Sequence, residues 1–107
     1  MKSLISCSLF VLLIVSQCAP AFAEEFDDLM LKWDERRELA TKYLLEAEKA
    51  LKNGDKVIGC ANQKIASKYG IEASRSLIKA MKVNGSTDGI EDFKAGLNKW
   101  KELGDFC

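Results

Sequence analysis

The sequence has no histidine and a single proline among its 107 residues. Histidine is the commonest general acid–base residue, the commonest protein ligand for metals, and the base in most serine and cysteine nucleophile pairs. Lysine plus arginine and aspartate plus glutamate number 16 each, so the formal net charge is zero. This balance argues against the broad basic surface of a nucleic-acid-binding protein. The composition therefore predicts a protein that is not an enzyme and does not bind nucleic acid.

No other motif supplies the missing chemistry. The loop of residues 84–89 carries oxygen-bearing side chains before a glycine, as an EF-hand loop does, but Ala95 stands where the closing glutamate belongs. The acidic pairs at residues 27–28 and 91–92 fall where helices are expected to start, and carboxylates stabilise the helix dipole there. We expect no catalytic residue, no metal site and no cofactor.

The first 23 residues have the pattern of a secretory signal peptide. Lys2 gives a positive start, residues 4–15 are nearly all apolar, and Ala21-Phe22-Ala23 is a cleavage sequence. The apolar run is shorter than the roughly 20 residues that a transmembrane helix needs. The sequence predicts a signal peptide over residues 1–23, a single domain over residues 24–107, and export to the periplasm or beyond, with at most peripheral membrane contact.

The cysteines support the same compartment. Cys18 follows a stretch similar to a lipobox, but Gln17 stands where a small residue is required, so we do not expect lipid anchoring. Removal of the leader leaves Cys60 and Cys107, and two cysteines in an oxidising compartment predict a disulfide. A link of this span stabilises a chain by about 4 kcal/mol in the chain-entropy model.

Apolar residues recur at steps of three and four along the mature chain, which is the spacing of helix faces. This pattern predicts a long helix through residues 26–51, helices over 55–70, 71–83 and 90–103, a cap at Asp55, and a cap at Ser86, Thr87 or Asp88. The link at Gly70 is so short that the middle two helices can equally be one. We therefore expect an all-α, three- or four-helix antiparallel bundle with one disulfide.

Charge is segregated along the chain. Residues 24–35 and 83–107 are acidic, whereas residues 36–82 carry a net positive charge. The basic residues of the middle helices are the candidate binding residues: Lys64, Lys68, Arg75, Lys79 and Lys82. Arg37 is a further candidate, since helical spacing places it within the apolar stripe of the first helix.

These features predict a small exported helical interaction protein of the bacterial cell envelope, with a protein partner that presents an acidic surface. Two alternatives stay open from the sequence. The first is a carrier of a small ligand in a bundle cavity near Arg37 and the two tryptophans. The second is a secreted membrane-active effector, because the helices are amphipathic and the middle of the chain is basic.

Overall fold

The computed structural model describes the backbone of residues 2–107 and the side chains of residues 23–107. It contains three helices: α1 (Lys2–Lys52), α2 (Lys56–Val83) and α3 (Ile90–Asp105). No strand occurs within residues 2–107. The prediction of an all-α fold with three or four antiparallel helices is therefore confirmed in its three-helix form.

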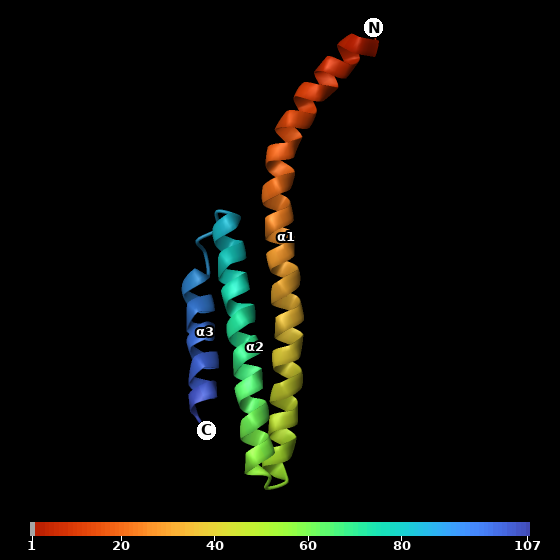
Figure 1. Cartoon of the computed structure of the whole chain (residues 1–107). Helices are drawn as coiled ribbons and strands as arrows, with labels where there is room; N and C mark the ends of the chain where they lie inside the picture. Colours follow the sequence, from red (N-terminus) through yellow and green to blue (C-terminus); the bar gives the residue numbers. More distant parts are fainter. Residues whose placement is uncertain (1) are drawn as a thin grey trace.

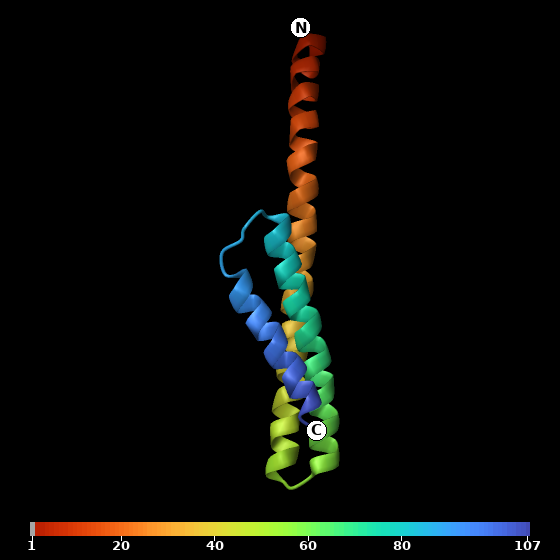
Figure 2. The ribbon, with the colours of Figure 1, turned by 90° about the vertical axis from the view of Figure 1, so that its left-hand side faces the viewer.

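The three helices lie side by side, with α2 in the middle and each neighbour antiparallel to it (Figure 1). Within the described residues, α1 and α3 both pack against α2 but not against each other. The chain measures 77 × 26 × 13 Å along its principal axes, so the helices form a single layer. Figure 2 shows that α3 is inclined to α2 and that the start of α1 extends beyond both other helices.

Gly70 does not end a helix. The structure joins the predicted helices over residues 55–70 and 71–83 into the single helix α2, with Gly70 buried in its interior. A Cβ atom on Gly70 would overlap the indole ring of Trp100 from α3. The glycine is thus a site of close helix approach rather than a stop signal.

The helix ends follow the sequence in part. The Asp55 side chain accepts a hydrogen bond of 3.0 Å from the amide of Ile58, which confirms the predicted cap of α2. The residue before α3 is Gly89, with φ of 80° and no side-chain cap, so the prediction of a cap by Ser86, Thr87 or Asp88 was wrong. Because α1 begins at Lys2, the acidic residues 24–28 lie in the middle of this helix and not in a first turn.

Small residues form the core. On α2, Gly59, Ala66, Ala73 and Ala80 are spaced by seven residues, and all four are buried. Their counterparts on α1 are Ala40 and Ala47, again seven apart and buried. Only one large aliphatic residue in the described part of the chain, Ile78, is buried. Such small residues let the two backbones approach closely, while most large apolar side chains stay at the borders of the layer.

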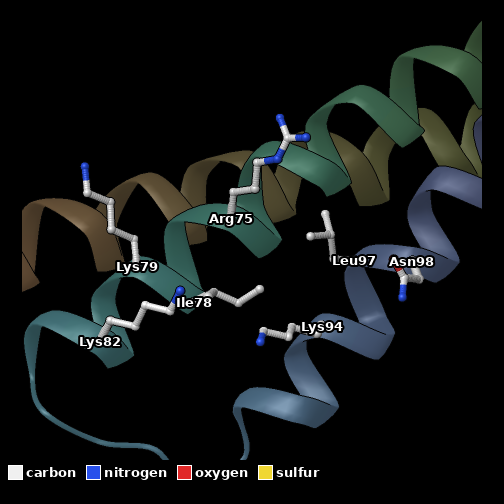
Figure 3. Close-up of a pocket in the computed structure, with 7 residues that line it drawn as sticks. All are labelled: Arg75, Ile78, Lys79, Lys82, Lys94, Leu97 and Asn98. Atoms are coloured by element: carbon white, nitrogen blue, oxygen red, sulfur yellow. The ribbon is translucent and has the colours of Figure 1, made fainter.

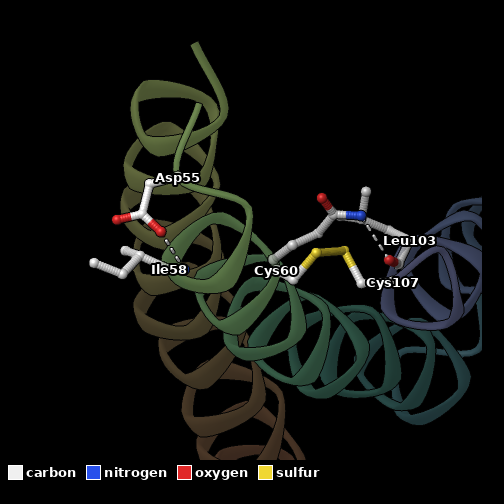
Figure 4. Close-up of a disulfide and its surroundings, with 6 residues drawn as sticks. Asp55, Ile58, Cys60, Leu103 and Cys107 are labelled. Atoms are coloured by element: carbon white, nitrogen blue, oxygen red, sulfur yellow. Dashed lines mark hydrogen bonds between the residues drawn. A yellow bond between two sulfur atoms is a disulfide. The ribbon is translucent and has the colours of Figure 1, made fainter. Parts of the chain in front are cut away.

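Two hydrogen bonds and a disulfide hold the carboxyl half of α3 against α2. The Gln63 amide donates a hydrogen bond of 2.9 Å to the carbonyl of Leu103, and the Ser67 hydroxyl donates one of 2.6 Å to the carbonyl of Trp100. The predicted disulfide between Cys60 and Cys107 is present, with the Cα atoms 5.7 Å apart (Figure 4). The last turn of α3 is therefore tied to the first half of α2.

The structure describes only part of the predicted leader. The side chains of residues 1–22, which include Cys18, lie outside the described residues, and cleavage after Ala23 stays a prediction. Within the part of the chain that was described, no helix combines the length and the apolar character needed to cross a bilayer.

Candidate functional site

The five basic residues predicted on the middle helices share one face of α2. Lys64, Lys68, Arg75 and Lys82 follow one another at steps of four, seven and seven residues, which places them in one stripe, and Lys79 lies beside it. All five side chains are exposed. The stripe runs for about 27 Å, given the rise of an α-helix.

Two adjoining grooves between α2 and α3 follow this stripe. The first is lined by Arg75, Ile78, Lys79, Lys82, Lys94, Leu97 and Asn98 (Figure 3). The second is lined by Lys64, Ser67, Lys68, Ile71, Glu72, Arg75, Lys101, Gly104 and Asp105. Arg75 belongs to both, so they form one continuous surface, which we call the basic groove.

The floor of the basic groove is apolar. Ile78 is 9% exposed, and Ile71 and Leu97 are half-buried. In Figure 3, Ile78 and Lys82 extend from α2 toward α3, while Arg75 and Lys79 extend outward from the helix. The groove thus combines an aliphatic floor with cationic edges, a combination that suits an occupant with one apolar and acidic face.

Most cations of the groove are unneutralised. Within residues 23–107, none of the five α2 cations has a carboxylate oxygen within 4.0 Å. Of the two acids in the groove, Glu72 lies 3.0 Å from the Nε atom of Arg36 on α1. Lys94 is 3.7 Å from Glu91, its neighbour on α3. The surface therefore keeps an excess of positive charge that an anionic partner can neutralise.

The structure places Arg37 apart from the basic groove. Its guanidinium lies 2.6 Å from the carboxylate of Asp34 and 5.1 Å from the centre of the Trp33 ring, and its side chain is half-exposed. Trp33 is on α1, whereas Trp100 packs on Gly70 from α3, on a helix that does not pack against α1. Arg37 is thus held by its own helix and is not brought together with the lysines.

Sequence reasoning missed the contribution of α3 to the groove. Lys94 and Lys101 are seven residues apart and so lie on one face of α3, which a search for helical spacing could have detected. Their position opposite Lys82 and Lys68 depends on how α3 packs, and no local pattern reports this. The pairing of Arg36 with Glu72 is equally a product of tertiary structure.

Among the described residues, no group of three or more histidine, cysteine, aspartate or glutamate side chains is placed to hold a metal ion. No protein-family model, curated protein or solved structure matches the chain.

Proposed function

We propose that the chain is an exported, non-catalytic interaction protein that binds an acidic helix of a partner protein in the basic groove. The observation that carries this proposal is the stripe of α2 cations, all exposed and all without a carboxylate within 4.0 Å in the described part of the chain. Like charges held this close repel one another, and an acidic partner turns that repulsion into attraction.

The shape of the groove favours a helix over a single small anion. The cations extend along about 27 Å, or five helical turns, which is far more than one phosphate or carboxylate contacts. Ile71, Ile78 and Leu97 provide apolar contacts along the same line. An amphipathic helix with apolar anchors and acidic flanks matches both features, as in other helix-in-groove complexes.

Two features support export. The Cys60–Cys107 disulfide is typical of an oxidising compartment. Residues 1–23 carry the signal-peptide pattern, so we expect the accumulated protein to begin at Glu24. Mass spectrometry of the intact protein from envelope fractions tests this expectation, and a mass that includes residues 1–23 contradicts it.

In-cell photo-crosslinking tests the binding site. A photo-reactive amino acid in place of Lys79, at the edge of the groove, should capture a defined protein that presents an acidic helix, whereas the same substitution at Lys99 should not. Lys99 is exposed on α3 and lies outside the basic groove.

Charge reversal completes the test. The pair Lys68→Glu and Arg75→Glu should abolish the crosslink from position 79, and the matched pair Lys56→Glu and Lys99→Glu should leave it intact. An unchanged crosslink in the groove variant, or capture of no protein with an acidic helix, contradicts the proposal. Equal binding of both variants to anionic lipid vesicles, without any protein crosslink, favours the membrane-active alternative.

A further inference from the structure

The outer face of α1 carries exposed leucines between acidic residues. Leu31 is 68% exposed and Leu45 is 56% exposed. Nine residues, or two and a half helical turns, separate Leu31 from the buried Ala40, so Leu31 points away from α2. The stripe on this face, which we call the acidic ridge, consists of Asp27, Leu31, Asp34, Glu38, Thr41 and Leu45.

The acidic ridge has the same spacing as a stripe on the outer face of α2. Both stripes advance by steps of four, three, four, three and four residues. The stripe on α2 consists of Val57, Ala61, Lys64, Lys68, Ile71 and Arg75. Both therefore keep to one helix face over the same length of about 27 Å.

The two stripes are complementary when they run antiparallel. Asp27, Asp34 and Glu38 then fall opposite Arg75, Lys68 and Lys64 respectively. In the same register the apolar side chains also meet, because Leu31 falls opposite Ile71 and Leu45 opposite Val57. Thr41 and Ala61, the two small residues, form the remaining pair. Each of the six positions thus matches in charge, polarity or size.

The register also accounts for exposed apolar surface. Val57 is 82% exposed, and together with Leu31 and Leu45 it belongs to the most exposed large apolar residues of the described chain. Within one chain the ridge cannot reach the groove, because α1 packs on α2 through the opposite face that carries Ala40 and Ala47. A ridge in the basic groove must come from another molecule.

We propose that a second copy of this chain docks its acidic ridge into the basic groove, with its α1 antiparallel to α2 in the register of Asp27 with Arg75 and Leu31 with Ile71. This inference rests on the proposed function, since it assigns the acidic helix that the groove accepts. Ridge and groove are different surfaces, so the contact is heterologous and each chain offers one of each. Salt weakens the association, because exposed ion pairs hold its register.

Two charge-reversed variants test the proposal in one experiment. The ridge variant carries Asp27→Lys and Asp34→Lys, and the groove variant carries Lys68→Glu and Arg75→Glu. Sedimentation velocity over roughly micromolar to millimolar concentrations should show association of the unmodified chain. Each variant alone should associate with an affinity at least about tenfold lower, since its contacts then join like charges.

An equal mixture of the two variants should recover association, because the unmodified groove of the ridge variant accepts the unmodified ridge of the groove variant, and the lysine ridge also fits the glutamate groove. Recovery also proves that both variants are folded. The control Lys56→Glu with Lys99→Glu should behave like the unmodified chain.

A monomeric unmodified chain at every concentration, or a mixture no more associated than its components, overturns the inference. If the groove crosslink to an acidic protein persists in that case, the proposed function stands and only the identity of the partner is wrong. If the unmodified chain does not self-associate and the groove forms no crosslink, both proposals are overturned.

Discussion

The two interfaces of α2 are built on different principles. Against α1, a long run of small residues spaced by seven lets two helices lie close together, and the stacked rings of Tyr43 and Tyr69, 5.8 Å apart, lie beside this seam. Against α3, the contact is concentrated near one end, where Trp100 covers Gly70 and the disulfide ties Cys107 to Cys60.

The difference follows from helix length. The contact between α1 and α2 extends over many turns, so weak contacts between small residues add up along it. The 16-residue helix α3 has no buried residue of its own, and it therefore depends on discrete attachments. We expect the hairpin of α1 and α2 to keep its structure when α3 detaches. We do not expect α3 to stay attached to α2 when the hairpin of α1 and α2 unfolds.

Removal of the disulfide should have the largest effect on stability and tests how the two interfaces differ. Replacing Cys60 and Cys107 by serine should lower the free energy of unfolding by about 4 kcal/mol in the chain-entropy model. Hydrogen exchange should show that amide protection falls most in α3, while α2 amides that face α1 keep more of theirs. Urea unfolding measures the total effect, with the reduced native protein as the control. An equal loss of protection in α1 and α3 contradicts the division into a hairpin and an attached helix.

Trp100→Ala should cost about 3 kcal/mol of unfolding free energy, because it removes the largest side chain between α2 and α3 and leaves a void over Gly70. Trp100→Phe keeps part of the ring and should cost clearly less. Thermal unfolding of the disulfide-bonded protein measures both. If Trp100→Ala is as stable as the unmodified protein, the indole ring does not hold α3.

The two interfaces also differ in how far the sequence predicted them. Helix periodicity and the Asp55 cap depend only on residues close together in the sequence, so both were predictable. The disulfide was predictable because only two cysteines remain after the predicted leader. The role of Gly70 was not, because a glycine that ends a helix and one that admits an indole ring look alike until the neighbour is known.

For the same reason, the sequence predicted the α2 side of the basic groove but not the α3 side. The α2 lysines share a helix face, and spacing alone reveals this. Lys94 and Lys101 join them because Trp100 and the disulfide fix how α3 lies on α2. The arrangement as a single layer is likewise a tertiary result, since short loops only require that neighbouring helices be antiparallel.

A larger side chain among the small residues between α1 and α2 tests the other interface of α2. Ala73 is 4% exposed, and Ala73→Leu should destabilise the protein by about 2 kcal/mol, because α1 and α2 must separate to admit the larger side chain. Hydrogen exchange should then rise in α1 as well as in α2. Ala95→Leu, at an exposed position of α3, provides the control and should leave the unfolding midpoint nearly unchanged.

The smallest expected effect comes from the Asp55 cap at the start of α2, the helix that belongs to both interfaces. Asp55→Ala removes the acceptor for the Ile58 amide and should lower the unfolding free energy by about 1 kcal/mol. Because α2 supports both neighbours, the loss should lower amide protection equally on its two sides, unlike the loss of the disulfide. Asp55→Asn keeps a side-chain oxygen and should retain most of the stability. Loss of protection confined to the side of α2 that faces α1 would mean that Asp55 serves the turn between α1 and α2 rather than the start of α2.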